Sequence, residues 1–279
     1  MIHRDESLSA HEEIEKLEIA LLLEGIYRYN GYDFRNYSFP STRRRILGRM
    51  RGENQPSILA LLDKVLHERK AMDRLLADFS VNVTEMFREP GFFLAFRRQV
   101  VPYLRSIPAI RIWHAGCSTG EEVYSMAIVL HEEGLYHKTM LYATDMNEQV
   151  LRMAEHGVFP LHKMQLYTKN YFQSGGEEAF SNYYSVQESG VAFHSYLSEN
   201  MMFSQHNLAV DHSFNEFHVI VCRNVLIYFN PILQRRVVQL FNESLVHAGF
   251  LCLGSKEGLL KTHAVSLEEW DAKEKIYRK

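Results

Sequence analysis

The sequence HAGCSTGEE, residues 114–122, lies between a short apolar run, IRIW (110–113), and a helical pattern, EEVYSMAIVLHEEG (121–134). A strand, a turn of small residues and a helix in this order are typical of the β–α steps of an α/β domain. In open α/β sheets, ligands bind in the crevice at the carboxyl ends of the strands. The stretch therefore predicts both the fold class and the place where a ligand binds.

Within this stretch, GCSTG (116–120) also fits G-x-S-x-G, the pattern that carries the nucleophilic serine of α/β-hydrolases. A hydrolase would use Ser118 as the nucleophile and would need an acid and then a histidine later in the chain. Asp211 with His247 or His263 satisfies that order. A chain with fourteen histidines offers such a pair by chance, so the order alone is weak support.

The acidic residues near this loop favour a cofactor over a hydrolase. Glu121 and Glu122 would place negative charge beside a developing oxyanion, which disfavours acyl transfer. Asp145 follows a second strand-like run, TMLYAT (139–144), where a carboxylate can accept hydrogen bonds from ribose hydroxyls. The loop lacks the full G-x-G-x-x-G of dinucleotide sites. S-adenosylmethionine, with a ribose, a sulfonium cation and no phosphate, suits these acids better; a sheet-packing turn with solvated glutamates is the structural alternative.

The residues before this region predict a separate helical domain. Apolar residues at helical spacing mark four segments, and no strand pattern interrupts them. The expected helices cover about 12–28, 41–51, 57–66 and 70–78.

The α/β pattern continues after Asp145, with one interruption. We expect helices at 147–156 and 231–249 and strands at 217–222 and 250–254. Residues at about 160–200 differ, because two strand-like runs are separated there by Glu188, Ser189 and Gly190. We predict a hairpin-like insertion at this point.

The overall composition excludes several classes of protein. A net charge of −3 and an isoelectric point of about 6.5 argue against wholesale nucleic-acid binding. The three cysteines lie far apart, so we expect no disulfide framework and a reducing cytoplasm. No histidine has the spacing of a metal site, and we expect no metal. The apolar run IALLLEGIY (19–27) is far shorter than the ~20 residues of a membrane span.

A basic segment, STRRRILGRMR (41–51), coincides with the second expected helix. It fits a solvated basic face, a nucleic-acid contact or a docking surface for an acidic protein. The segment lacks interleaved aromatic residues and any known nucleic-acid motif, which disfavours the second interpretation. The candidate partner-binding residues are Arg43, Arg44, Arg45, Arg49 and Arg51.

Four motif regions together resemble the CheR-type chemotaxis receptor methyltransferases, which methylate glutamate side chains with S-adenosylmethionine. The regions occur in the family's order over nearly the whole chain. Met86, His114 and Val123 depart from the residues that are usual in these motifs. The regions are VNVTEMFREPGFF (81–93), IWHAGCSTGEEVYSMAI (112–128), YATDMN (142–147), and FSQHNL (203–208) with VCRNVLIYF (221–229).

This resemblance implies a Rossmann-like α/β methyltransferase fold. It implies a seven-stranded sheet, an N-terminal helical domain and a small antiparallel β-subdomain. We therefore expect a receptor-facing helical domain over 1–80 and a linker over 81–93 that carries N-x-T-x-x-x-R. The S-adenosylmethionine-dependent methyltransferase domain would cover 94–279, with the β-subdomain inserted at about 160–200.

The resemblance also assigns cofactor contacts and a candidate catalytic pair. Arg88 has a guanidinium fork that can hold one oxygen of a substrate carboxylate and leave the other free; a salt bridge with Glu89 or another acid is the structural alternative. Tyr228 would lie near the transferred methyl group; a buried core tyrosine is its alternative. Ser118 becomes a turn residue. The expected cofactor-binding residues are Asn82, Thr84, Arg88, Gly116, Glu122, Asp145, Asn207, Leu208, Arg223 and Asn224.

The implied reaction is methyl transfer from S-adenosylmethionine to glutamates of chemotaxis receptors for sensory adaptation, leaving S-adenosylhomocysteine. The implied partner is the cytoplasmic helical region of those receptors. We expect a cytoplasmic monomer that binds no nucleic acid and does not insert into a membrane. A catalytically silent adaptor that binds the cofactor and docks on receptors is the alternative, and intact Asn82, Arg88 and Tyr228 argue against it.

Overall fold

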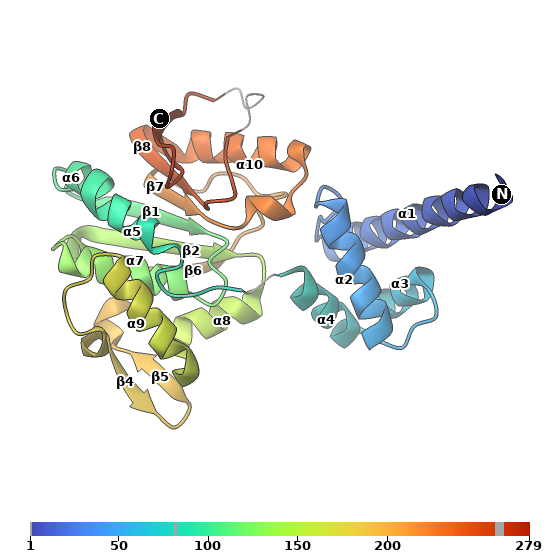
Figure 1. Ribbon diagram of the computed structural model, residues 1–279, viewed down its shortest axis with the longest axis horizontal. Helices are drawn as coiled ribbons and strands as arrows, with labels where there is room; N and C mark the ends of the chain where they lie inside the picture. The colour runs from blue at the N-terminus through green and yellow to red at the C-terminus, as the bar shows by residue number, and fades with distance from the viewer. Residues whose placement is uncertain (1, 81–82, 260–264) are drawn as a thin grey trace. The chain divides into compact units, whose positions relative to one another are not determined.

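The computed structural model of the chain describes residues 2–80, 83–259 and 265–279 (Figure 1). The chain divides into two compact units, each of which has its own core. The first comprises Met1–Val81 with Tyr228–Gln234, and the second comprises Asn82–Ile227 with Arg235–Lys279.

The first unit is built from the four predicted helices. Their apolar faces meet in a core that includes Leu22, Ile46, Leu61 and Leu75, all fully buried. The side chain of Ser57 caps the third helix by accepting a hydrogen bond from the Ala60 N–H at 3.1 Å. The helices are α1 (Ile2–Asn30), α2 (Phe39–Gly52), α3 (Ile58–His67) and α4 (Arg69–Phe79).

A later segment, residues 228–234, completes this helical unit. Phe229 forms a β-bridge with Tyr37, and their rings lie 5.0 Å apart. The Ser38 N–H donates a hydrogen bond of 2.8 Å to the Tyr228 carbonyl. The first unit is therefore discontinuous in sequence.

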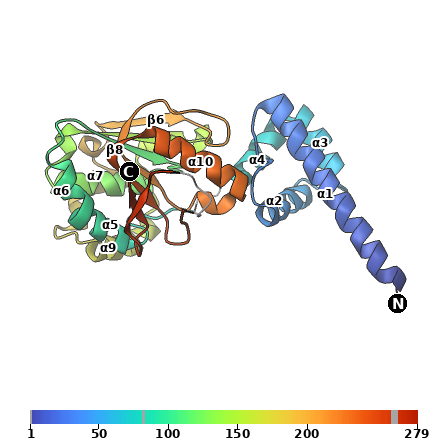
Figure 2. The ribbon, with the colours of Figure 1, turned by 90° about the horizontal axis from the view of Figure 1, so that it is seen from above.

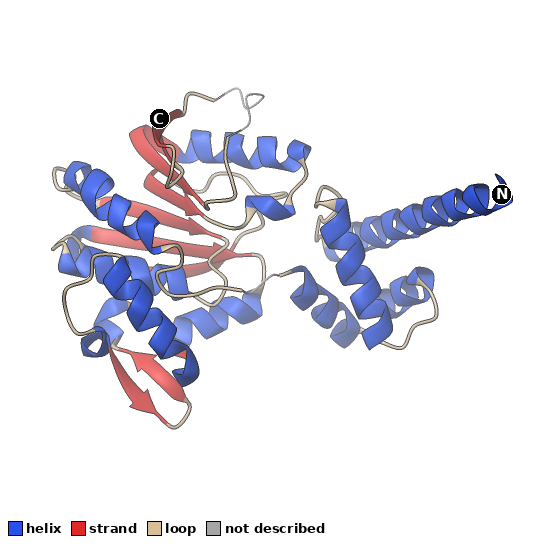
Figure 3. Cartoon of the chain, in the orientation of Figure 1, coloured by secondary structure: helices blue, strands red, loops and turns tan. Residues whose placement is uncertain are grey.

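The second unit contains the predicted seven-stranded sheet (Figure 3). The strand order is β6-β2-β1-β7-β8-β10-β9; the first five strands are parallel to their neighbours, and β10 and β9 are antiparallel. The strands are β1 (Ile110–Ala115), β2 (Thr139–Asp145), β6 (Met201–Gln205), β7 (Phe217–Cys222), β8 (Leu245–Leu253), β9 (Glu268–Asp271) and β10 (Ile276–Arg278).

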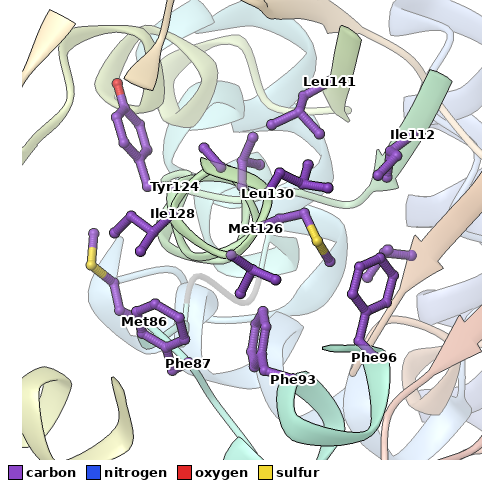
Figure 4. Packing of buried hydrophobic residues seen from close by; sticks show 14 of the residues in the cluster. Met86, Phe87, Phe93, Phe96, Ile112, Tyr124, Met126, Ile128, Leu130 and Leu141 are labelled. Carbon is purple, nitrogen blue, oxygen red and sulfur yellow. The ribbon is translucent and has the colours of Figure 1, made fainter. Parts of the chain in front are cut away.

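Helices cover both faces of this sheet (Figure 2). On one face, Ile110 and Ile112 of β1 join a buried cluster with side chains of α5 and α7 (Figure 4). On the other face, Trp113 contacts Phe241 of α10, with ring centroids 5.4 Å apart, because successive strand residues point to opposite faces. The helices are α5 (Pro90–Ala95), α6 (Val101–Leu104), α7 (Glu121–Glu132), α8 (Glu148–His156), α9 (Met164–Gln173) and α10 (Pro231–Ser244), with a π-helical turn at Phe96–Val100.

Two boundaries differ clearly from the sequence prediction. The first helix, expected from about residue 12, begins at Ile2. The helix expected over 231–249 ends at Ser244, and β8 begins at Leu245. Leu245 is buried and residues 246–248 are more exposed, and this part of β8 pairs with β7 through a register shift. Tertiary pairing with β7 therefore overrides the helical spacing of this stretch.

The predicted small antiparallel subdomain is confirmed. Its strands are β3 (Val158–Phe159), β4 (Tyr184–Gln187) and β5 (Gly190–Phe193), in the order β3-β5-β4. Its aromatic core includes Phe159 and Phe193, whose rings lie 5.5 Å apart. Short 3₁₀ helices in the second unit occur at Tyr136–Lys138, Leu161–Lys163, Phe180–Tyr183 and Ser195–Leu197, and a further one spans Leu226–Tyr228.

Candidate active site

The loop after β1 depends on glycine geometry. Gly116 and Gly120 have φ angles of +81° and +93°, and Ser118 between them has a φ of 51°. A Cβ atom at position 116 would lie 2.6 Å from a methyl carbon of Val225, so only glycine fits there. The loop is therefore packed directly against the turn that follows β7.

Asp145 at the end of β2 is tied to this loop. Its Oδ2 accepts a hydrogen bond of 3.0 Å from the Ser118 N–H, and its Oδ1 accepts one of 3.0 Å from the Asn147 N–H. Burial raises the pKa of Asp145 above its usual value, and the backbone N–H groups offset part of that rise. The carboxylate retains lone pairs that can accept ribose hydroxyls.

A buried charge cluster lies at the ends of β1 and β7. Arg223, whose side chain is fully buried, donates at 2.8 Å to Glu122 and at 2.9 Å to Glu89. It also donates at 2.9 Å to the Arg88 carbonyl. His114 Nδ1 lies 3.2 Å from the second oxygen of Glu122. One guanidinium therefore links three segments that are distant in sequence.

Both carboxylates of this cluster are ionised at neutral pH. Burial raises the pKa of Glu122, but the hydrogen bond from His114 and the charge of Arg223 outweigh it, so the pKa lies below its usual value. Burial also raises the pKa of Glu89. The charge of Arg223 and the hydrogen bonds from Ser255 outweigh this effect, so the pKa of Glu89 lies below its usual value. The cluster thus holds one arginine charge between two carboxylate charges.

Arg88 itself is left available for a ligand. Its Nη1 donates at 2.8 Å to the Val83 carbonyl. No carboxylate of residues 2–80, 83–259 or 265–279 lies within ion-pair distance of its guanidinium, and Glu89 pairs with Arg223 instead. Thr84 is half-buried in the same segment. The expected contact Asn82 lies outside the described residues.

The loop after β6 approaches the end of β2. The His206 N–H donates at 3.1 Å to the Asp145 carbonyl, which fixes the start of the loop. Asn207 is held by its N–H, which donates at 2.7 Å to Asp211. Leu208 is buried. Asn207 and Leu208 thus follow directly after a residue that is bonded to the end of β2.

Asn224 completes this group of residues. Its φ of 61° is left-handed, and its side-chain amide donates at 3.3 Å to Glu89. Its N–H donates at 2.8 Å to Glu257. Glu89, His114, Ser255 and Glu257 were not among the sequence candidates. The contacts of Glu89, Ser255 and Glu257 join segments that no local pattern connects, whereas His114 meets Glu122 within the stretch 114–122.

The other sequence candidates lie in the first unit. Tyr228 has its ring under the Arg45 guanidinium, 4.9 Å from the ring centroid. Arg45 is buried and donates at 2.7 Å to the Phe79 carbonyl, and burial lowers its pKa. Arg49 makes a two-pronged pair with Asp78 at 2.6 and 2.8 Å. These two arginines therefore stabilise the helical unit.

The remaining arginines of the basic segment are exposed. Arg43 pairs with Glu15 of α1. Arg44 and Arg51 have no carboxylate partner within the part of the chain that the structure describes. The basic segment thus presents fewer unpaired charges than its sequence indicates.

The site geometry suits S-adenosylmethionine. Glu122 and Asp145 place negative charge beside a glycine loop, which favours the cationic sulfonium and ammonium groups and disfavours a pyrophosphate. A Cβ atom at Gly120 would lie 2.9 Å from that of Ala154, so the loop cannot carry larger side chains. Among the described residues, no three His, Cys, Asp or Glu side chains are grouped to hold a metal ion.

No described helix is both long enough and apolar enough to span a membrane.

Two family models match the chain. The "CheR methyltransferase, SAM binding domain" matches residues 82–275, and the "CheR methyltransferase, all-alpha domain" matches residues 17–80. "Putative methyltransferase Cher3" of Pseudomonas putida is 46% identical over 264 residues, covering 94% of this chain and 97% of that protein. A chemotaxis protein methyltransferase of Listeria innocua is 29% identical, covering 82% and 86%.

"Chemotaxis protein methyltransferase 1" of Pseudomonas aeruginosa is 27% identical and covers 73% of this chain and 76% of that protein. The matches extend through the helical unit and the α/β unit, including the charge cluster and the loops that meet it. The predicted fold class, enzyme class and cofactor are thereby confirmed. The chain belongs to the CheR family of S-adenosylmethionine-dependent methyltransferases.

Proposed function

We propose that this enzyme transfers the methyl group of S-adenosylmethionine to glutamate side chains of chemotaxis receptors. The products are glutamate methyl esters and S-adenosylhomocysteine, and the role is sensory adaptation in the cytoplasm. Similarity to proteins named chemotaxis protein methyltransferases supports the receptor as substrate. We further propose a monomer in which residues 1–80 face the receptor, 81–93 form a linker and 94–279 carry the chemistry.

The availability of Arg88 carries this proposal. Arg223 fixes the Arg88 carbonyl and takes Glu89 as its own partner. The backbone of Arg88 is thus anchored by Arg223. Its guanidinium forms no ion pair with a carboxylate of the described residues. A substrate glutamate offers the carboxylate that this fork binds best.

The chemistry requires alignment rather than a general base. A free glutamate has a pKa of about 4.3 and is ionised at neutral pH. Bound S-adenosylmethionine supplies an electrophilic methyl group on a cationic sulfur. Arg88 would hold one glutamate oxygen while the other attacks the methyl carbon; the carbon–sulfur bond breaks and sulfur keeps the electron pair. Alignment of this kind contributes roughly 7–11 kcal/mol in favourable cases.

The cofactor residues divide by chemistry. Asp145 would accept the ribose hydroxyls, and Glu122 would face the cationic end of the cofactor. Gly116 leaves room for the ligand beside the backbone. Arg223 would contribute by holding Glu122, since its buried side chain already contacts two carboxylates and a carbonyl. Thr84, Asn207, Leu208 and Asn224 are the further proposed contacts, and Tyr228 is proposed near the methyl group.

Substitution of Arg88 tests the proposal. We expect Arg88→Ala to lower kcat/KM for receptor methylation by about 100-fold, because a charged contact to the reacting carboxylate is lost. Affinity for S-adenosylhomocysteine should fall much less. Tritiated methyl transfer to receptor-containing membranes measures the first quantity, and calorimetry measures the second.

The exposed Arg98 provides a matched control. Arg98→Ala should leave both quantities unchanged, and Arg88→Lys should retain part of the activity because it keeps the charge without the fork. Normal receptor methylation by Arg88→Ala would refute the assignment. Wild-type protein that binds S-adenosylhomocysteine but methylates no receptor would favour the silent adaptor.

A further inference from the structure

Glu257 is a buried carboxylate in the turn that follows β8. Its Oε2 accepts hydrogen bonds of 2.7 Å from the Gly254 N–H and 2.8 Å from the Asn224 N–H. Its Oε1 accepts one of 3.3 Å from the Ile227 N–H. One side chain therefore closes its own turn and fastens the turn after β7.

The fastened turn has a backbone conformation that needs support. Asn224 has a φ of 61°, a left-handed conformation that few residues other than glycine adopt and that asparagine tolerates better than most. The approach is also close, since a Cβ atom at Gly254 would lie 2.8 Å from the Asn224 nitrogen. The hydrogen bonds to Glu257 thus hold this left-handed residue in place in a closely packed turn.

Among the described residues, backbone N–H groups alone balance the charge of Glu257. No lysine, arginine or histidine in the described parts of the chain forms an ion pair with it. Burial raises its pKa above the usual value, and the N–H groups of Gly254, Asn224, Ile227 and Leu226 offset part of the rise. Burial of a carboxylate costs stability, so the position of Glu257 between two turns calls for a role other than stabilisation.

The same turn also reaches the charge cluster. The N–H and hydroxyl of Ser255 donate at 3.0 and 2.9 Å to Glu89. Glu89 in turn contacts Arg223 and Asn224. The turn after β8 therefore contacts Glu89, which pairs with Arg223, and Asn224, which follows Arg223 in the chain. Arg223 in turn holds Glu122.

We propose that Glu257 is a positioning residue for cofactor binding, because its carboxylate fixes the turn that places Arg223 and Asn224. The inference rests on the cofactor side of the proposed function. Glu257 touches no reacting atom, so its removal should weaken binding of the cofactor without impairing methyl transfer in the complex that does form.

Glu257→Gln is the decisive variant, since its amide has the shape of the carboxylate but turns one acceptor into a donor. A donor would then face a backbone N–H. We expect the KM for S-adenosylmethionine and the Kd for S-adenosylhomocysteine to rise about ten-fold, as loss of one buried hydrogen bond predicts. The kcat at saturating cofactor should stay within about three-fold of wild type.

A raised KM with an unchanged kcat distinguishes a positioning role from partial loss of the folded protein. A variant that is only partly folded would show a lower kcat and an unchanged KM, since the folded molecules bind normally. That result, or an unchanged Kd, would overturn the proposal. Glu188→Gln, at an exposed position between β4 and β5, is the matched control and should behave as wild type.

Two further measurements keep the test decisive. If Glu257→Gln fails to fold, Glu257→Asp retains the charge at shorter reach and must still raise the Kd with little change in kcat. Calorimetry with S-adenosylhomocysteine requires no methyl acceptor. If the wild-type protein methylates no receptor, the proposed substrate is wrong. The role of Glu257 is then decided by the Kd for S-adenosylhomocysteine alone.

Discussion

Single polar residues connect the strand ends that form the site. Arg223 is the central example, because its fork of N–H donors reaches Glu122, Glu89 and the Arg88 carbonyl at once. Its guanidinium carbon lies 4.2 Å from the Phe92 ring centroid, so an aromatic face covers the charge. Buried pairs of this kind seldom add net stability, but loss of one partner leaves an uncompensated charge. The cluster is therefore better explained by precise placement of Glu122 than by stability.

Asp145 should affect binding more than stability. Burial raises its pKa in the folded state, so its ionised form costs stability at neutral pH and folding is favoured as pH falls through that raised pKa. Asp145→Asn removes the buried charge, but each carboxylate oxygen accepts a backbone N–H, so the amide would place a donor against one of them. We expect these two effects to offset to within about 1 kcal/mol in the unfolding free energy of the ligand-free protein. The same change should weaken S-adenosylhomocysteine binding, because a ribose acceptor is lost.

Thermal unfolding with and without S-adenosylhomocysteine checks both effects in one experiment. The variant should melt close to wild type without ligand and gain less than wild type when the ligand is added. A variant with undiminished ligand stabilisation would remove Asp145 from the cofactor site.

Among the structural elements, three helices of the first unit, α2, α3 and α4, are joined through one carboxylate. Glu53, just after α2, receives two hydrogen bonds from Arg74 of α4, at 2.6 and 2.8 Å. It also pairs with Lys64 of α3 at 3.0 Å and with Arg49 of α2 at 3.3 Å. The hydrogen bonds from Arg74 are the largest cause of a pKa lowered from 4.5 to about 2. Short helices are marginal alone, so such connections stabilise their assembly.

We expect Glu53→Gln to lower the unfolding free energy of the helical unit by about 2 kcal/mol, as loss of a charged hydrogen-bond acceptor predicts. Because the folded pKa lies below the usual one, the stabilisation in the wild type is complete above pH 4.5 and is lost as pH falls toward about 2.

Two probes distinguish the units in this measurement. Trp113 and Trp270 both lie in the α/β unit, so tryptophan fluorescence reports on that unit while circular dichroism includes the helical unit. The variant should shift the helical transition and leave the fluorescence transition in place. The exposed Glu12→Gln serves as control, and equal shifts for both variants would contradict the role of Glu53.

At the scale of the whole molecule, the two units divide recognition from chemistry in our proposal. The formal net charge is only −3, but Arg44 and Arg51 leave unpaired positive charge on α2 within the described chain. Such charge attracts an acidic helical partner and accelerates association. Arg45 and Arg49 are engaged within the helical unit, so they are poor choices for testing this surface.

Charge reversal at the two exposed arginines tests docking. We expect Arg44→Glu with Arg51→Glu to raise the KM for receptor about ten-fold without changing affinity for S-adenosylhomocysteine. The effect should shrink as salt is added, because screening weakens long-range attraction. The matched control reverses Arg69 and Lys70, which are exposed on α4. Equal loss in the control would point to net charge rather than to a docking surface.

The fold class could be predicted because its signals are local. The strand–turn–helix at 110–134 and the apolar run at 217–222 follow periodicities that the structure retains. The end of the helix at Ser244 could not be predicted, since pairing of Leu245 with Phe217 decides it. The expected contacts Gly116 and Asp145 lie at strand ends and follow from the same local signals. Their assignment to the cofactor stays a prediction.

By itself, the sequence determined the helical segments, the α/β alternation, the antiparallel insertion and the family, because each depends on neighbouring residues or on ordered motifs. Only the tertiary structure decided which charges meet. Arg223 takes Glu89, so Arg88 has no carboxylate partner among the described residues, and Glu257 holds Asn224 across the turns after β7 and β8. Hydrogen bonds are short and directional, so such pairings depend on three-dimensional placement that spacing along the chain does not encode.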